Sequence, residues 1–411
     1  MSQRRIRKNK NVFSDLRRRQ GWMLENSSLR KLCNLALCAT HYALKREVMR
    51  AWPVVVKVDI SPLCNLRCTF CVHAMPHNEP ALERQQFRRN QFMPVERFEQ
   101  IAAEIDGKSS AVSLYYLGDP LTHPELAGIC ESAWKHRLNS HISTNLSFRM
   151  TDKDIERLVT SGLTHLTVCV DGLTQANYER TRVGGKIELV LNNLRRIVEC
   201  KRHSNMKYPK VEAQFLKFQH NVHELPAALD LLDEIGVDQV TDFWGFLARA
   251  TFMSPGGYDV TGPREDKVLP ACYWPYMGMQ IKYNGDVIPC CTYRTIEQYQ
   301  VGADPRVLGN VFDTSVWEVW NSAAYRQIRR FVGKPSRVLG DPSLTQTFCH
   351  ECPELFVTNS RETHLTGDKH RWEDHYERDE RGRVRPRRIA ELPVLQNYEP
   401  ALPTERELIE V

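Results

Sequence analysis

Strand-like and helix-like segments alternate between residue 53 and about residue 250, and this alternation restricts the fold more than any other feature of the chain. Six apolar, β-branched runs are separated by segments whose apolar residues recur with helical spacing. Parallel strands need such crossover helices, so the pattern predicts an α/β fold with a helix-covered parallel sheet. Six units favour a partial (β/α)6 TIM-like barrel over an open sheet. The expected strands are residues 54–60, 111–117, 141–144, 165–170, 211–218 and 239–244.

The remaining segments of the 411-residue chain differ in composition, which predicts four parts. Residues 1–50 form a basic arm and an amphipathic helix, residues 51–250 the barrel, and residues 251–358 a Cys-rich domain. Residues 359–411 are dense in charge and Pro, so we expect a disordered tail. No run of ~18 apolar residues occurs, so no transmembrane segment is expected. No secretory signal is visible, which predicts a cytoplasmic protein.

The amphipathic segment, residues 28–50, has more than one interpretation. Eight Lys or Arg and a single acid, Asp15, lie in residues 1–20 before it. Its apolar residues recur near helical spacing, so we expect a helix that packs on the main domain. A basic amphipathic helix also suits peripheral contact with a membrane surface or a partner. An Arg-rich targeting peptide is a third interpretation.

Thirteen cysteines without a secretory signal indicate metal binding or catalysis rather than disulfides. Cys64, Cys68 and Cys71 form a C-x3-C-x2-C group directly after the first expected strand. Three thiolates on one loop can bind three irons of a cubane and leave the fourth iron open. An open metal position normally serves chemistry, whereas structural zinc takes four ligands. A zinc site completed by His73 remains the alternative.

The run from Cys64 to Cys71, CNLRCTFC, resembles the signature of radical S-adenosylmethionine (SAM) enzymes, with Phe70 as the aromatic residue before the third cysteine. The resemblance implies a [4Fe–4S] cluster whose open iron chelates SAM. A one-electron donor such as flavodoxin or ferredoxin then drives cleavage to a 5'-deoxyadenosyl radical, which takes hydrogen from the substrate. In such an enzyme the cofactor carries the chemistry and the protein positions it.

Four further segments resemble motifs of this family. YLGDP (116–120) stands where the family has a GGEP-like motif at the methionine amino group, with Leu117 in place of the first Gly and Asp119 in place of Glu. STN (143–145) resembles the stretch near the adenosine, and VCVDG (168–172) resembles a common strand end. YERTRVGG (178–185) resembles the segment whose Arg meets the cofactor carboxylate, a role that suits a bidentate fork. The implied cofactor contacts are Phe70, Gly118, Asp119, Pro120, Ser143, Asn145, Cys169 and Arg182.

A second cysteine group follows the barrel. Cys272, Gly285 and Cys290 have the spacing C-x12-G-x4-C, and Cys349 and Cys352 form a C-x2-C pair. This pattern resembles the SPASM domain or its shorter twitch form. The resemblance implies one auxiliary [4Fe–4S] cluster bound by these four cysteines, because no cysteine follows Cys352. Zinc on the same four thiolates and Cys291 in place of Cys290 are the alternatives.

The motifs predict the initiating step and leave the substrate open. The resemblance implies abstraction from a carbinol C–H bond of a sugar or aminocyclitol-like metabolite. Transfer of an electron to the auxiliary cluster gives dehydrogenation, whereas return of hydrogen by a thiol gives epimerisation. Cys169 is the expected thiol because it lies at a strand end, where barrel sites are built. The alternatives are a peptide-modifying maturase and a non-catalytic zinc or iron–sulfur module that binds RNA.

Overall fold

The computed structural model of the chain describes residues 21–69, 71, 73, 91–218, 220–244, 272–290, 307–334, 341–347 and 349, and four short strands between residues 362 and 386. Phe70, Cys291 and Cys352, together with residues 1–20, lie outside the described residues. Within the described ranges, no helix is long and apolar enough to cross a lipid bilayer.

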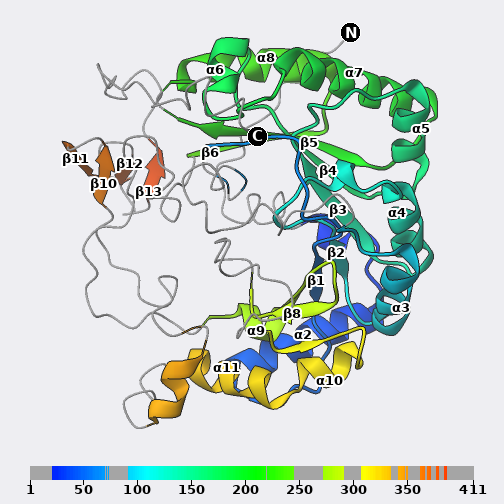
Figure 1. The fold of residues 1–411 in the computed structure, drawn as a ribbon, viewed down its shortest axis with the longest axis vertical. Helices are drawn as coiled ribbons and strands as arrows, with labels where there is room; N and C mark the ends of the chain where they lie inside the picture. Colours follow the sequence, from blue (N-terminus) through cyan, green and yellow to red (C-terminus); the bar gives the residue numbers. More distant parts are fainter. Residues whose placement is uncertain are drawn as a thin grey trace.

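A nine-stranded sheet forms the centre of the molecule (Figure 1). Its order is β6-β5-β4-β3-β2-β1-β7-β8-β9, so the first six strands run parallel in sequence order. This arrangement confirms the expected α/β fold and is compatible with a partial barrel. The strands are β1 (Val55–Val58), β2 (Ala111–Ser113), β3 (Asn139–Thr144), β4 (His165–Cys169), β5 (Lys210–Lys217), β6 (Gln239–Trp244), β7 (Gly278–Ile281), β8 (Asp286–Ile288) and β9 (Gly309–Asn310).

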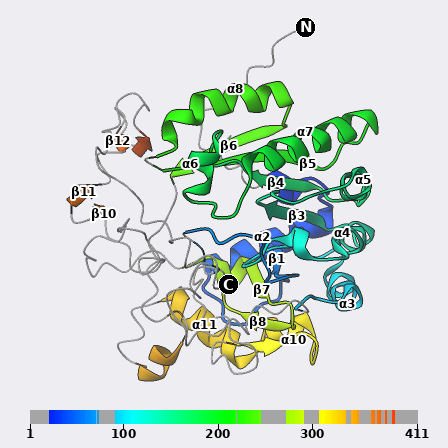
Figure 2. The ribbon, with the colours of Figure 1, turned by 45° about the horizontal axis from the view of Figure 1, so that its top comes forward.

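Helices cover the outer face of the parallel strands (Figures 1 and 2). Successive residues of a strand point to opposite faces, and the apolar set of each strand points to these helices. Val56, Val112, Ile142 and Leu166 belong to the resulting core. Thr151 caps α5 with a capping box to Asp154, as the sequence predicted for its start. The helices are α3 (Val95–Ile105), α4 (Leu126–Lys135), α5 (Asp152–Thr160), α6 (Gln175–Glu179), α7 (Ile187–His203) and α8 (Leu225–Ile235).

The Cys-rich segment extends the sheet beyond β1. Strand β7 pairs with β1 in parallel, and β7 and β8 form a hairpin that turns at Gly285, where φ is 87°. The pattern of residues 316–331 by itself predicts a single helix, but the segment forms two helices, because Asn321 ends one and Ser322 caps the next. The helices of this segment are α9 (Trp274–Met277), α10 (Val316–Trp320) and α11 (Ala323–Gly333).

A buried arginine links these helices to one another and to the segment after α2. Arg329 is fully buried and donates to the backbone oxygens of Pro275 (2.8 Å), Glu47 (3.0 Å) and Trp320 (2.7 Å). Its guanidinium also lies 4.3 Å from the Trp320 ring centroid. Burial lowers the pKa of Arg329 to about 10, so the group stays charged at neutral pH.

We expect Arg329→Met to lower the free energy of unfolding by about 3 kcal/mol or more, because several buried carbonyls lose their donor. Urea unfolding followed by circular dichroism measures this change. The exposed Arg326→Met is the matched control and should stay within about 0.5 kcal/mol of the parent chain. Equal stabilities of the two variants would contradict the proposed linking role.

The two ends of the described chain differ from expectation. The amphipathic helix α2 (Leu29–Ala43) is shorter than the predicted segment and follows a short 3-10 helix at Gly21–Leu24. The tail, expected to lack regular structure, contains two hairpins whose strands pair locally and so need no apolar core. These strands are β10 (Glu362–Leu365), β11 (Asp368–Arg371), β12 (Tyr376–Arg378) and β13 (Val384–Pro386).

Candidate active site

The cysteine loop follows β1 and is held against the segment that contains Arg182. The backbone N–H of Arg67 donates to the oxygen of Val183, and that of Thr69 donates to the oxygen of Thr181, each over 3.0 Å. Two motifs more than a hundred residues apart in sequence therefore lie side by side. This placement brings Cys68 within 3.8 Å of Arg182 Nη1.

Gly118 allows the YLGDP segment to lie directly on the same loop. A Cβ at Gly118 would fall 2.1 Å from the Ser61 oxygen and 2.3 Å from the Leu63 oxygen, so no larger residue fits without a backbone shift. The N–H of Asp119 donates to the Leu63 oxygen over 2.7 Å. The glycine thus serves a close backbone approach, which sequence analysis had assigned only to cofactor contact.

The three thiols of the loop are electrostatic neighbours. Burial raises the pKa of Cys64 well above its ordinary value, and Asp119, Cys68 and Cys71 raise it further. Neighbouring thiolates repel one another, and positively charged iron offsets this repulsion. The three thiols therefore form a donor set that fits an iron–sulfur cluster. Within the described ranges, no three His, Cys, Asp or Glu side chains are already arranged to hold a metal ion. The loop therefore brings the three cysteines together, but their sulfur atoms do not have the arrangement of metal ligands.

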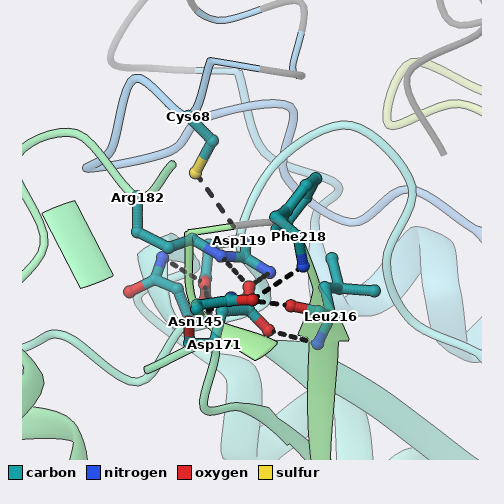
Figure 3. A network of polar contacts seen from close by, with 8 residues as sticks. Cys68, Asp119, Asn145, Asp171, Arg182, Leu216 and Phe218 are labelled. Carbon is teal, nitrogen blue, oxygen red and sulfur yellow. Dashed lines mark hydrogen bonds and ion pairs between the residues drawn. The ribbon is translucent and has the colours of Figure 1, made fainter. Parts of the chain in front are cut away.

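Asp119 lies in a buried polar network at the ends of β2 and β3 (Figure 3). Its carboxylate accepts hydrogen bonds from Leu121 N–H (3.0 Å), Thr144 Oγ1 (2.9 Å), and both the backbone N–H (2.8 Å) and Nδ2 (2.6 Å) of Asn145. Burial raises the pKa of Asp119 to about 6 despite these donors. Asn145 also points its amide at Cys64 Sγ, 3.9 Å away. These contacts make Asp119 a positioning group for the strand ends beside the cysteine loop.

Arg182 forms a buried ion pair with Asp171 (Figure 3). Its Nε and Nη2 each lie 2.6 Å from Asp171 Oδ2, and the N–H of Leu216 donates to Oδ1 over 2.8 Å. Burial raises the pKa of Asp171, and the Arg182 guanidinium offsets part of this increase. The pairing fixes the guanidinium beside Cys68. Sequence analysis had identified Arg182 and had not identified its partner.

Cys169 lies at the end of β4 on the inner face of the sheet. Its side chain is buried, and burial is the main reason why its pKa is raised, so the thiol stays protonated at neutral pH. Arg182 lowers this pKa, whereas Asp171 and Asp119 raise it. Ser143 is the hydrogen-bond partner of the thiol. The structure thus brings the predicted residues Ser143, Cys169 and Arg182 together around the strand ends.

Two thiols of the second cysteine group influence a buried tyrosine. Burial raises the pKa of Tyr325, and Cys290 and Cys349 raise it further. In the part of the chain that the structure describes, this buried hydroxyl has no hydrogen-bond partner. Cys272 raises the pKa of Tyr276 in the same way. An orphaned O–H among thiols fits a cluster whose sulfur atoms accept hydrogen bonds.

The inner face also carries polar residues that sequence analysis missed. Lys57 is the register partner of Ser113 on one side and of Gln280 on the other. The same row continues from Ser113 to His141 and then to His165. Parallel register partners share a face, so these five side chains form one row across five strands. The sequence signal for this row is the alternation of polar residues with apolar core residues along the strands.

The fold and the site together define a class of domain: a parallel α/β sheet with three cysteine thiols, suited to an iron–sulfur cluster, at the carboxyl ends of its strands. Residues 58–208 match the family model of the Radical SAM superfamily. Residues 272–353 match the SPASM iron–sulfur cluster-binding domain. The chain therefore contains a radical SAM domain followed by a SPASM domain. The first domain implies SAM and a [4Fe–4S] cluster, and the second implies auxiliary iron–sulfur clusters.

Two curated relatives cover part of the chain. A probable GTP 3',8-cyclase of Methanococcus maripaludis is 26% identical over 196 residues, which are 46% of this chain and 58% of the relative. An Fe-coproporphyrin III synthase of Methanosarcina barkeri is 23% identical over 189 residues, which are 46% of this chain and 43% of that protein. The chain therefore spans about half the length of these relatives.

Solved structures extend the likeness in fold. Streptococcus suis SuiB bound to precursor peptide SuiA superposes with a TM-score of 0.52 at 14% identity, over 79% of this chain and 74% of that chain. SuiB bound to S-adenosylmethionine gives a TM-score of 0.51 at 17% identity, over 72% of each chain. At these identities the likeness shows a common fold.

Proposed function

We propose that the protein abstracts a hydrogen atom from a carbinol C–H bond of a small, hydroxyl-rich metabolite such as a sugar or aminocyclitol. The single observation that carries this proposal is the polar inner face of the sheet next to Cys169. A substrate with many hydroxyl groups needs donors and acceptors along the surface that binds it. The residues proposed to bind the cluster and SAM would hold these cofactors at one end of that surface.

The inner face offers both fixed and available hydrogen-bonding groups. Glu212 is held by His165 Nε2 (2.8 Å) and by Thr241, which keeps the centre of the face rigid. Burial, with His165 and Lys57 nearby, lowers the pKa of His141 well below its ordinary value, so this imidazole is neutral. The polar side chains of this face that are only half-buried, and so within reach of a ligand, are Lys57, Ser143 and Gln214.

Two buried polar atoms of the same face lack partners among the described residues. These are Ser113 Oγ and Gln280 Oε1, the two register neighbours of Lys57. Leaving such an atom unsatisfied costs about 1–3 kcal/mol, so a ligand that supplies the missing hydrogen bonds gains affinity there. This supports a substrate rich in hydroxyl groups over an apolar one.

The chain's own residues have distinct proposed roles around the cofactors. Cys64, Cys68 and Cys71 would hold the radical SAM cluster, and Cys272, Cys290, Cys349 and Cys352 the auxiliary one. When bound, the cluster and SAM supply a 5'-deoxyadenosyl radical as the hydrogen acceptor. Arg182, oriented by Asp171, would place its guanidinium charge beside an anionic ligand such as the SAM carboxylate. Direct contact of Asp119 with the methionine amino group stays a prediction.

Cys169 is the proposed hydrogen donor for an epimerisation. A neutral S–H is the form that returns a hydrogen atom, and the raised pKa keeps the thiol in that form. Ser143, its hydrogen-bond partner, holds the thiol on the inner face. Its register partner Gln214 stands beside it on β5.

Anaerobic incubation with candidate sugars, aminocyclitols and peptides in heavy water tests the proposal. We expect deuterium at one inverted carbon of a hydroxyl-rich substrate, together with 5'-deoxyadenosine. In Cys169→Ala the inverted product should fall on the order of 100-fold, comparable to removal of a positioned proton donor, while 5'-deoxyadenosine is still formed.

Cys200→Ala is the matched control, because Cys200 lies half-buried on α7 outside both cysteine groups. It should leave deuterium incorporation unchanged. An oxidised product without deuterium would replace epimerisation by dehydrogenation. Modification of peptides alone would refute the hydroxyl-rich substrate and favour a peptide maturase.

A further inference from the structure

Helix α2 turns its apolar face away from the protein. Leu29 is 79% exposed, Leu32 is 46% exposed and Leu37 is 37% exposed. Leu44, directly after the helix, is 59% exposed. At 100° per residue these positions lie on one side of the helix. The α2 apolar face comprises Leu29, Leu32, Cys33, Ala36, Leu37, Thr40 and Leu44, all exposed.

The opposite side of α2 is fixed by specific contacts. Lys31 donates to the backbone oxygen of Arg137, and Cys38 Sγ donates to the oxygen of Trp52 over 3.2 Å. Asn34 exchanges two hydrogen bonds with the Trp52 backbone, at 2.9 and 2.8 Å. Leu35, Cys38 and Tyr42 on this side also pack on the hydrophobic core. The helix thus buries a mixed polar and apolar side and keeps a second, leucine-rich side exposed, where an ordinary surface helix is polar.

Exposed apolar side chains concentrate in this one region. Among the residues that the structure describes, eight large hydrophobic side chains are exposed, and six of them lie between Leu24 and Val48. Scattered exposed apolar residues are normal, whereas a contiguous group marks an interaction site. The concentration on α2 and its flanks indicates a surface that is covered when the protein functions.

The charges around the α2 apolar face identify what covers it. The helix contains no acidic residue, and the exposed side chains of Arg30, Arg46 and Arg50 flank it. The nearby Glu47 is neutralised by Arg330 at 2.9 Å. Residues 1–20, which precede this region in the sequence, contain eight Lys or Arg and one Asp. An apolar helix face with basic flanks is complementary to a bilayer that carries anionic headgroups.

We propose that the α2 apolar face docks the protein on the surface of an anionic lipid bilayer. The helix contacts Trp52 and Arg137, which precede β1 and β3, so it lies at the amino ends of these strands. The cysteine loop follows β1 at the carboxyl end. Docking through α2 therefore leaves the candidate active site facing away from the bilayer. The helix lies on the membrane surface without crossing it.

Flotation of the full chain with lipid vesicles tests the proposal. We expect the protein to float with vesicles of phosphatidylcholine mixed with phosphatidylglycerol and to bind phosphatidylcholine alone much more weakly. Each basic residue near the anionic surface strengthens binding by roughly fivefold, so added salt should weaken flotation. Leu32→Glu with Leu37→Glu should lower the bound fraction by about tenfold or more, since two apolar side chains lose burial.

Asn192→Glu with Ala227→Glu is the matched control, because it adds the same charge at exposed positions of α7 and α8. It should float like the parent chain. Unchanged circular dichroism of both double variants excludes unfolding as the cause. Failure of the parent chain to float, or equal flotation of the two double variants, overturns the proposal. A lipid-free dimer that Leu32→Glu with Leu37→Glu dissociates would identify a second copy as the occupant and overturn it too.

Discussion

Cys68→Ala should release 5'-deoxyadenosine at no more than background, a loss of at least ~1000-fold or about 4 kcal/mol in barrier terms. Cys68 is the central thiol of the loop after β1, and Arg182 Nη1 lies 3.8 Å from its sulfur. Removing one of three proposed ligands leaves too few thiolates to hold a cluster with one open iron. Anaerobic reconstitution, iron and sulfide content, and chromatography of the nucleoside measure the result.

The control for this variant is Cys200→Ala, which should retain the iron content and the nucleoside yield of the parent chain. The auxiliary site is a further internal reference, because Cys68→Ala should keep the iron bound there. A parent chain that binds only zinc at the loop would contradict the proposed ligand set. So would a Cys68→Ala variant that still cleaves SAM.

Asp171→Ala should lower the free energy of unfolding by about 3–5 kcal/mol, because it leaves the Arg182 guanidinium buried without its counter-charge. Asp171 is fully buried, and both contacts of Arg182 to its Oδ2 are 2.6 Å long. Urea unfolding of the cluster-free protein measures the stability. SAM binding should fall as well, since the free guanidinium loses its fixed position beside Cys68.

The double variant Asp171→Leu with Arg182→Met separates stability from cofactor binding. Replacing a buried ion pair by apolar side chains is often neutral for folding, so much of the lost stability should return. SAM binding should stay at or below the level of Asp171→Ala, because the double variant lacks the guanidinium. Recovery of SAM binding in the double variant would show that Arg182 has only a structural role.

Local patterns were sufficient to predict the elements of the barrel. The strand at Gln239–Trp244 was expected with its observed bounds, and the cap of α5 at Thr151 was expected from its side chain. Both features depend on neighbouring residues in sequence, which is why single-chain reasoning finds them. The break between α10 and α11 was missed. Asn321 and Ser322 occur within an otherwise helical pattern; in the structure the Ser322 hydroxyl caps α11, and Arg329 binds the Trp320 oxygen at the end of α10.

The sequence by itself determined the order of strands and helices, the family, and the cysteine spacing proposed for cluster binding, because each of these is written in residues close together along the chain. Only the tertiary structure decided which distant residues meet. It paired Arg182 with Asp171 and aligned Lys57 with Ser113 and Gln280 on adjacent strands. It also left the leucine-rich side of α2 exposed, because hydrogen bonds from Lys31, Asn34 and Cys38 hold the opposite side against the barrel. Helical periodicity shows that a helix has two different faces, and packing against the rest of the protein determines which one is exposed.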